Sequence, residues 1–376
     1  MWRDMKTQVI TSDSSSPWAA AREGAAALRE GKLVGFATET VYGIAVNAAI
    51  PAALERLREL KSRPDRPFSL HVGRAADIYR YVAAPPELAR RLIDKALPGP
   101  ITLLLPTGGS LAEGSPGGGD PGLYGRLVSG DVLGVRCVAE PTAQAMLADV
   151  DAPVVAPSAN LAGRPSPRSA DDVLADLDGK IDLLIDSGPT RYGRDSTIVD
   201  FTAPAWRIVR AGVIDERMIQ KMLTRLYVFV CTGNTCRSPI AAGVARVLLA
   251  KRLGVSVAEL ASQGVEVVSA GLYAMEGDHA SPEAVVAAAE FGAEIAAHRS
   301  RKATSELIQS ADMVFCMTQH HVEQAVQLAP QAASRIVRLD PRGDVPDPIG
   351  GSVGDYRDVA GLIASAFTRR LDRGLP

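Results

Sequence analysis

The sequence predicts an α/β protein of two domains, and three observations support this prediction. At 376 residues the chain is longer than one hydrophobic core usually serves. Apolar residues make up 47% of it, which is enough to bury two ordinary cores. Short apolar runs with strand character alternate with stretches of helical spacing, a pattern typical of sheets covered by helices.

The first half is expected to contain a tail and one domain. Residues 1–16 are interpreted as a disordered tail and residues 17–213 as the domain. Helices are predicted at about 18–30, 51–61 and 88–97, with proline near the start of the first two. Short apolar runs predict strands at 33–37, 101–105, 133–138, 153–156, 181–185 and 197–201. Residues 108–130 are rich in Gly, Ser and Pro, so they are interpreted as a disordered surface insertion.

The second half is expected to be a smaller domain, residues 226–376, joined by a linker at 214–225. Ile214, Met218 and Met222 repeat at helical spacing, so the linker is predicted to be helical. Strands are predicted at 226–230, 265–268, 313–317 and 335–339, and helices separate them. This alternation predicts a small four-stranded parallel sheet with helices on both faces.

Charge and cysteine content exclude several classes of protein. Up to residue 212 there are 24 basic and 25 acidic residues, and after it 17 and 18, so neither half has the basic excess of a strong nucleic-acid or membrane binder. The four cysteines are too few and scattered for a disulfide scaffold. No apolar stretch is long enough to span a membrane, and a cytoplasmic location is expected.

The loop at residues 231–238, with the sequence CTGNTCRS, carries the clearest chemistry in the chain. It follows an apolar strand and precedes a helix, so its backbone N–H groups and the helix N-terminus predict an anion site. A cysteine in such a place commonly has a pKa lowered to roughly 3.5–7.5, which makes Cys231 a candidate nucleophile. Arg237 can bind two phosphoryl oxygens with its planar fork, and Ser238 can hydrogen-bond the thiolate.

A cysteine-dependent phosphatase also needs an acid that protonates the leaving group. Asp347 lies in the sequence VPDPIGG, where Pro348 restricts it to extended backbone. An extended residue in an exposed loop can project its carboxyl group toward a neighbouring site. Asp347 is therefore the candidate general acid.

These motifs resemble the low-molecular-weight protein tyrosine phosphatase family over residues 226–376. The resemblance implies that Cys231 is the nucleophile, Arg237 the phosphate-binding group and Asp347 the general acid. It also implies that Asn234 and Ser269 hold the loop in shape and that His298 braces the same network. No cofactor is expected for this half.

Two features favour phosphoarginine over phosphotyrosine as the substrate. Ile349 and Gly350 stand after Asp347-Pro348, where tyrosine phosphatases of the family usually carry aromatic residues. Thr235 stands where those enzymes usually carry an aliphatic residue, and the loop resembles that of the bacterial protein arginine phosphatases. A threonine hydroxyl can accept a guanidinium N–H, which an aliphatic residue would leave unpaired at roughly 1–3 kcal/mol. A tyrosine phosphatase remains the alternative.

Polar clusters follow several predicted strands of the first half and together fit a site for a polyanion. They are 38–43 (TETVYG), 61–64 (KSRP), His71, Arg136, 157–160 (PSAN), 195–197 (DST) and 210–212 (RAG). Basic residues supply charge, while hydroxyls and amides supply orientation. No GxxxxGK[ST] loop is present, so the pattern does not indicate a P-loop nucleotide site.

The same clusters, in this order, resemble the YrdC-type threonylcarbamoyl-AMP synthases. The resemblance implies a twisted mixed sheet with helices and the formation of threonylcarbamoyl-AMP from ATP, L-threonine and bicarbonate, with Mg²⁺ on the phosphates. It implies a place in tRNA threonylcarbamoyladenosine synthesis, with tRNA-modification proteins as partners. The implied ATP-binding residues are Lys61, Arg63, Ser158, Asn160, Ser196 and Arg210. The implied threonine-binding residues are Thr40, Tyr42, His71 and Arg136.

Two other interpretations of the whole chain stay open at this point. The first half could be a tRNA or double-stranded RNA binding module, although its net charge of −1 does not favour one. One half could also be an inactive docking domain. The sequence predicts a bifunctional enzyme whose second half acts on a phosphoprotein.

Overall fold

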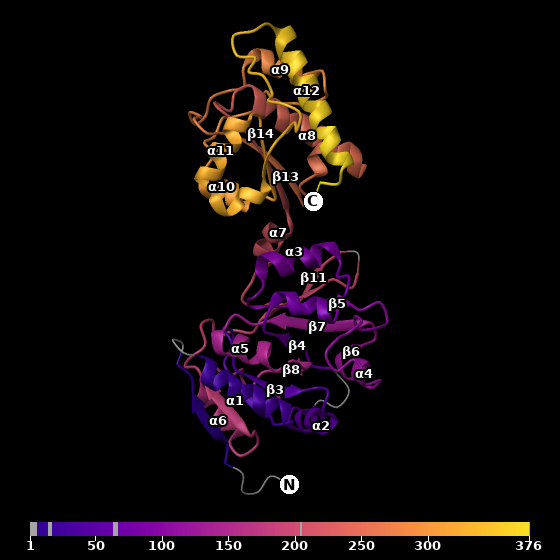
Figure 1. The fold of residues 1–376 in the computed structure, drawn as a ribbon, viewed down its shortest axis with the longest axis vertical. Coiled ribbons are helices and arrows are strands. Elements are labelled where there is room, and N and C mark those ends of the chain that lie inside the picture. The colour runs from indigo at the N-terminus through magenta and orange to yellow at the C-terminus, as the bar shows by residue number, and fades with distance from the viewer. Residues whose placement is uncertain (1–5, 14–16, 63–66, 204, 376) are drawn as a thin grey trace. The chain divides into compact units, whose positions relative to one another are not determined.

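The computed structural model describes residues 6–13, 17–62, 67–203 and 205–375. The chain forms two compact units, Met1–Leu223 and Thr224–Pro376 (Figure 1). Each unit has its own sheet and core. Among the described residues, no helix combines the length and apolar character needed to cross a membrane.

The N-terminal unit is built on one mixed sheet. Its helices and strands are β1 (Gln8–Thr11), α1 (Trp18–Arg29), β2 (Val34–Phe36), β3 (Gly43–Asn47), α2 (Pro51–Leu60), β4 (Leu70–Val72), α3 (Glu87–Ala96), β5 (Ile101–Pro106), α4 (Leu123–Leu127), β6 (Val128–Ser129), β7 (Val132–Cys137), α5 (Pro141–Asp149), β8 (Val154–Val155), α6 (Ala170–Leu177), β9 (Leu183–Asp186), β10 (Thr197–Asp200), β11 (Arg207–Arg210) and α7 (Glu216–Leu223). Within the described chain the strand order is β1-β9-β2-β3-β8-β4-β7-β5-β10-β11, and β6 pairs with β7. Parallel and antiparallel pairs alternate irregularly, which confirms the predicted mixed sheet.

Two predictions about irregular segments were wrong. Residues 8–11, expected within a disordered tail, form β1 and pair in parallel with β9. Residues 1–5 and 14–16 of that tail lie outside the described residues. The insertion at 108–130 contains α4 and β6, and Leu123 and Leu127 are buried in the core. The many glycines of this segment led to a prediction of disorder, but Leu123 and Leu127 bury enough apolar surface for it to fold.

The segment between the halves is helical and belongs to the N-terminal unit. Helix α7 packs on α3, where Ile219 and Leu223 are buried, and Nε of Arg91 donates to the carbonyl of Leu223 at 3.0 Å. Only Thr224 separates α7 from the first strand of the next unit.

The C-terminal unit contains a four-stranded parallel sheet, as predicted. Its elements are β12 (Arg225–Cys231), α8 (Arg237–Leu253), β13 (Val265–Gly271), α9 (Pro282–Ala289), α10 (Ser305–Ser310), β14 (Met313–Cys316), α11 (Gln319–Leu328), β15 (Ile336–Arg338) and α12 (Val353–Asp372). The strand order within the described residues is β13-β12-β14-β15, and every pair is parallel.

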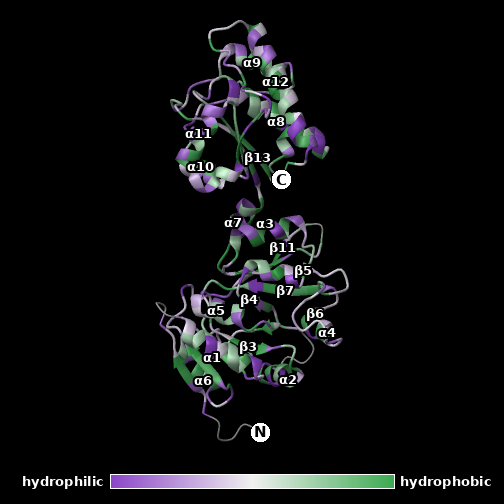
Figure 2. Ribbon diagram, in the orientation of Figure 1, coloured by the Kyte–Doolittle hydropathy of each residue, from purple (hydrophilic) through white to green (hydrophobic). Residues whose placement is uncertain are grey.

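Alternating side chains of β12 bury both faces of this sheet. Tyr227 and Phe229 join the core cluster under α8, α9 and α12, whereas Val228 and Val230 join the cluster under α10 and α11. This is the period-two pattern of a strand covered on both sides. Figure 2 shows the apolar residues along strands such as β3 and β13, while the covering helices carry polar residues as well. Parallel strands end at one edge, so the loops after β12, β14 and β15 meet there.

Candidate active sites

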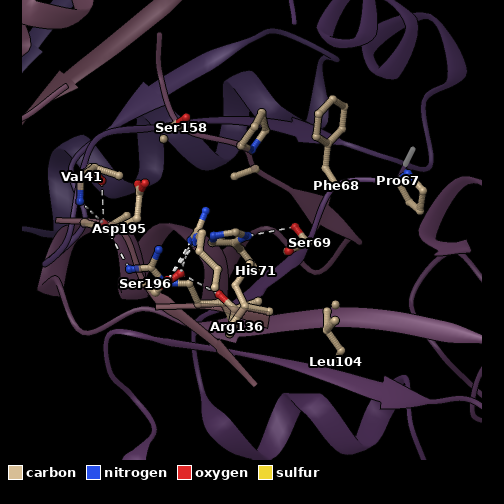
Figure 3. A pocket seen from close by; sticks show the side chains of 18 of the residues that line it. Val41, Pro67, Phe68, Ser69, His71, Leu104, Arg136, Ser158, Asp195 and Ser196 are labelled. Atoms are coloured by element: carbon tan, nitrogen blue, oxygen red, sulfur yellow. Dashed lines mark hydrogen bonds between the residues drawn. The ribbon is translucent and has the colours of Figure 1, made fainter. Parts of the chain in front are cut away.

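The N-terminal unit has a pocket of about 600 Å³ that most of the predicted synthase residues line. Those that line it are Tyr42, Lys61, His71, Arg136, Ser158, Ser196 and Arg210. Most of them lie on or next to strands that are distant in sequence, including β3, β4, β7 and β11, whereas Lys61 follows helix α2. Figure 3 shows His71 beside Arg136, its register partner on β7, with Ser158 and Phe68 around the same pocket. Arg63 lies outside the described residues.

Lys61 is held at the pocket wall by the loop after β8. Its Nζ donates to the carbonyls of Ser158 (3.0 Å) and Asn160 (2.6 Å) and to Oδ1 of Asn160 (3.1 Å). Asn160 is buried and does not line the pocket. Its amide therefore positions Lys61 and Ser158, whose Oγ donates to Asn160 Oδ1 at 2.5 Å.

A buried ion pair links Arg136, which lines the pocket, to Glu39, which does not. Nη2 of Arg136 lies 2.8 Å from Oε1 of Glu39, and the two side chains are 7% and 6% exposed. The same nitrogen donates to Oγ1 of Thr40 at 2.6 Å, and Thr40 is fully buried. Among the described residues Nε of Arg136 has no hydrogen-bond partner. Thr40 therefore stands behind Arg136 rather than on the pocket surface.

The protonation state of His71 follows from its contacts. Its Nδ1 lies 3.0 Å from the carbonyl oxygen of Ser69, which can only accept, so Nδ1 carries the proton and Nε2 is left as an acceptor. Burial and, secondly, the charge of Arg136 lower the pKa of His71 to about 3. The ring is therefore neutral near pH 7 and offers a lone pair on Nε2.

Tyr42 lines the pocket with its ring, but its hydroxyl is engaged elsewhere. It donates to the carbonyl of Gly188 at 2.7 Å and lies 3.1 Å from Oδ1 of Asp186. Burial, followed by the charge of Asp186, raises the pKa of Tyr42. The phenol therefore stays protonated and fixes the loop after β9.

Ser196 and Arg210 form the other end of the pocket. Arg210 donates through Nε and Nη2 to the carbonyl of Ser196 at 3.1 and 2.9 Å, and through Nη2 to Oγ of Ser196 at 3.0 Å. Thr102 Oγ1 lies 2.9 Å from the same hydroxyl. Burial lowers the pKa of Arg210, although the guanidinium stays charged at neutral pH.

In the C-terminal unit, the loop between β12 and α8 surrounds the sulfur of Cys231. Oγ of Ser238 lies 2.9 Å from Sγ, and the backbone N–H of Asn234 donates to Sγ at 3.2 Å. Burial raises the pKa of the Cys231 thiol, while these contacts and the charge of Arg237 oppose the rise. The motif predicted a lowered pKa, so the direction is wrong, because burial of the sulfur outweighs the donors around it.

Asn234 organises the loop through all of its polar groups. Its Nδ2 donates to Oγ of Ser238 and of Ser269, both at 2.9 Å, and its Oδ1 accepts the backbone N–H of Arg301. Its carbonyl accepts from Nε2 of His298 at 2.7 Å. Its φ of +58° is a conformation that asparagine tolerates better than most residues. The structure thus brings Asn234, Ser238, Ser269 and His298 together.

Arg237 and Asp347 meet at the mouth of the loop. Nη2 of Arg237 lies 2.5 Å from Oδ2 of Asp347, and the two side chains are 6% and 43% exposed. Asp347 is therefore the accessible member of the pair. Thr235 is half-buried, and its Oγ1 lies 3.6 Å from Sγ of Cys236.

Sequence reasoning missed several residues that support these sites. Glu39 lies in the TETVYG cluster without a predicted role, although an acidic residue between two threonines is a candidate partner for a buried arginine. His321, whose Nε2 lies 2.9 Å from Oγ1 of Thr232, belongs to a His-His pair in the first turn of the helix that follows β14. Its position in the first turn of a helix that follows a predicted strand could have marked His321 as a residue near the site. Asp186 carried no such signal, because nothing in the sequence places it beside Tyr42.

Comparisons with known proteins match the two units separately, on either side of the boundary between them. Residues 26–212 match the Sua5/YciO/YrdC family, described as telomere recombination, and residues 227–373 match low molecular weight phosphotyrosine protein phosphatase. A threonylcarbamoyl-AMP synthase of Pyrococcus abyssi is 38% identical over 54% of this chain and 56% of its own length. A putative threonylcarbamoyl-AMP synthase of Methanocaldococcus jannaschii is 33% identical over 51% of this chain and 84% of its own.

The second half has a relative of its own. A protein-arginine-phosphatase of Geobacillus stearothermophilus is 42% identical over 39% of this chain and 93% of its own length. The chain as a whole spans little more than half the length of the Pyrococcus synthase.

Proposed function

Because residues 26–212 belong to the Sua5/YciO/YrdC family and residues 227–373 to the low-molecular-weight phosphatase family, we propose that the chain is a bifunctional enzyme. The first half forms threonylcarbamoyl-AMP from ATP, L-threonine and bicarbonate, for tRNA threonylcarbamoyladenosine synthesis. The second half is a cysteine-dependent protein phosphatase that prefers phosphoarginine.

The synthase proposal is supported chiefly by the three basic side chains that line one pocket, those of Lys61, Arg136 and Arg210. Lys61 and Arg210 face the nucleotide phosphates, with the hydroxyl of Ser196 beside them. Ser158 completes the nucleotide site by holding Lys61 through its carbonyl. Arg136, whose free Nε has no described protein partner, faces the carboxylate or the bicarbonate. The neutral His71 accepts from the threonine through Nε2. The threonine amine and bicarbonate form a carbamate with loss of water. The pocket groups orient the carbamate and ATP and reduce their repulsion, so the carbamate oxygen attacks the α-phosphorus and pyrophosphate leaves.

The described residues fit Mg²⁺ only as an ion carried by the nucleotide. Asp195 is the one carboxylate among the described residues that line the pocket, and no cluster of three or more metal-ligating side chains occurs in the described chain. Mg²⁺ commonly binds substrate phosphates and water with one or two carboxylates. When bound, it would neutralise phosphate charge, with Asp195 as the available protein ligand.

Pyrophosphate release tests the synthase proposal against the RNA-binding alternative. We expect the protein to release pyrophosphate from ATP only when threonine and bicarbonate are both present. Release that does not require threonine would contradict the proposal. Salt-dependent RNA binding without any pyrophosphate release would favour the RNA-binding module instead.

The phosphatase proposal is supported chiefly by the position of Cys231 beside Ser238, with Arg237 and Asp347 at the mouth of the same loop. The Cys231 thiol first loses its proton to solvent, and the Ser238 hydroxyl, the Asn234 N–H and Arg237 stabilise the thiolate. The thiolate attacks phosphorus while the bond to the leaving group breaks, and Asp347 gives its proton to the departing atom. Asp347 then takes a proton from a water molecule whose oxygen attacks the cysteinyl phosphate. The S–P bond breaks, and inorganic phosphate leaves.

Phosphoarginine is favoured because the substrate would present N–H donors to the loop. Thr235 is half-buried in that loop and carries a hydroxyl that can accept one. Ile349, which is 71% exposed, and Gly350 provide no aromatic wall for a phenyl ring. A paired assay on phosphoarginine and phosphotyrosine peptides tests this. A higher kcat/KM for phosphotyrosine would establish the alternative substrate.

A further inference from the structure

A buried histidine joins two strand ends beside the phosphate loop. His321 lies in the first turn of α11 and is 4% exposed. Its Nε2 is 2.9 Å from Oγ1 of Thr232, which follows β12, and its Nδ1 is 3.0 Å from Oγ1 of Thr318, which follows β14. Because β12 and β14 are neighbours in the sheet, the ring bridges the ends of two adjacent strands.

The hydrogen bonds of the ring fit a single arrangement of both threonine hydroxyls. Oγ1 of Thr318 accepts the backbone N–H of His321 at 3.2 Å, as the N-cap of α11. We assign the ring proton to Nε2, so that the Thr318 hydroxyl donates to Nδ1 and Nε2 donates to Thr232.

Thr232 then has both lone pairs engaged. Its Oγ1 accepts from Nε2 of His321 and from Nη2 of Arg237, the latter at 3.3 Å. A hydroxyl has two acceptor positions and one proton, so the proton of Thr232 is directed away from both partners. Thr232 is exposed at the loop, which leaves this proton available to a bound phosphoryl oxygen.

The charges around His321 keep its ring neutral. Burial, then Arg237 of α8 and His320 of α11, lower the pKa of His321 to about 4, while Asp347 and Asp344 from the loop after β15 act in the opposite direction. A neutral ring does not repel the guanidinium of Arg237. It can therefore serve as a fixed hydrogen-bond donor at neutral pH rather than as a proton source.

We propose that His321 is a positioning residue of the phosphatase: it holds Thr232 against Arg237, so that the Thr232 hydroxyl donates to the phosphoryl group in the loop. The inference rests on the proposed phosphatase function of residues 227–373. The inference gives roles to His321 and Thr232, in addition to the nucleophile, the phosphate-binding arginine and the general acid.

Amide side chains of two lengths can test which contact of His321 matters. The amide of glutamine reaches the position of the imidazole Nε2, whereas that of asparagine reaches only the position of Nδ1. With p-nitrophenyl phosphate and the full-length protein, we expect His321→Asn to lower kcat/KM roughly tenfold, the effect of one lost hydrogen bond. His321→Gln should stay within about threefold of the wild type. In a Thr232→Val background, His321→Asn should cause less than about a twofold further loss, because the partner is already gone.

The outcomes separate this inference from the phosphatase proposal. Activity retained by Cys231→Ser would show that the phosphatase proposal itself fails. If Cys231→Ser is inactive, equal losses in the asparagine and glutamine variants, or multiplicative losses with Thr232→Val, would overturn the role of His321. If the His321 variants fail to fold, the Thr232→Val variant still tests the inference, because Thr232 is exposed and its substitution should not disturb folding. An unchanged kcat/KM for that variant would overturn the inference.

Discussion

The buried pair of Glu39 and Arg136 allows a quantitative prediction about stability. In Glu39→Gln the arginine charge stays buried without its counterion. At the 2.8 Å separation and an effective dielectric constant of about 20, the lost Coulomb attraction is roughly 6 kcal/mol, part of which is offset by the desolvation that the carboxylate no longer undergoes. The glutamine cannot satisfy both old contacts either. Oε2 of Glu39 accepts the backbone N–H of Ala139 at 2.8 Å, and an amide nitrogen there would face another donor. We expect a loss of about 3–5 kcal/mol.

Tryptophan fluorescence can follow this loss in the intact protein. The three tryptophans, Trp2, Trp18 and Trp206, all precede residue 224, so their emission reports the N-terminal unit. For a unit of this size, 3–5 kcal/mol corresponds to a fall in Tm of roughly 6–20 °C, and urea unfolding would give the free energy directly. The thermal midpoint of phosphatase activity should not change.

An exposed ion pair provides the matched control. Arg29 and Asp149 lie 3.2 Å apart, but their side chains are 48% and 47% exposed. Asp149→Asn should therefore cost less than about 1 kcal/mol. Adding Arg136→Met to Glu39→Gln should recover part of the lost stability, because no buried charge then remains. If Glu39→Gln cost no more than Asp149→Asn, the reasoning about burial of this pair would be wrong.

Four further predictions concern the two sites. Lys61→Ala should lower the rate of pyrophosphate release at least tenfold, since a phosphate charge loses its counterion; a normal rate would remove Lys61 from the ATP site. Cys231→Ser should abolish phosphatase turnover but leave vanadate binding measurable by calorimetry, because serine is a far weaker nucleophile and Arg237 is unchanged. Thr235→Ile should lower kcat/KM for a phosphoarginine peptide about tenfold to a hundredfold and that for phosphotyrosine little; an unchanged ratio would show that Thr235 does not select the substrate. The pKa of His71, about 3, means that the unfolded chain binds a proton below about pH 6.5 while the folded unit does not. Stability from this residue is therefore complete above pH 6.5 and falls by about 2 kcal/mol by pH 5; urea midpoints should show this slope in the wild type and not in His71→Gln.

The second half was predicted better than the first, because most of its catalytic residues lie close together in the sequence. The nucleophile, the arginine and the serine of the phosphatase lie within one loop of eight residues, so the spacing of residue types already carries the geometry. In the first half, β3 and β4 were not predicted. Both are short and fully buried, so they lack the alternation that marks a half-exposed strand.

Side-chain direction within the N-terminal site could not be predicted from spacing. Thr40 and Tyr42 lie in the predicted cluster, yet the hydroxyl of Thr40 accepts from Arg136 and that of Tyr42 contacts Asp186 and Gly188. Their partners are about a hundred residues or more away in the chain. Such pairings depend on how distant strands align in the sheet, which a single sequence does not reveal.

The direct passage from α7 to β12 restricts how a gene for this protein can be divided. A gene split after residue 213 would give a first product without Ile219 and Leu223, and the surface of α3 that these residues cover would face water. Its second product would begin with an amphipathic helix that has lost its partner. A split at Thr224 would leave both cores complete. A fusion that replaces the phosphatase half would therefore keep the first core complete only if it is joined after Leu223.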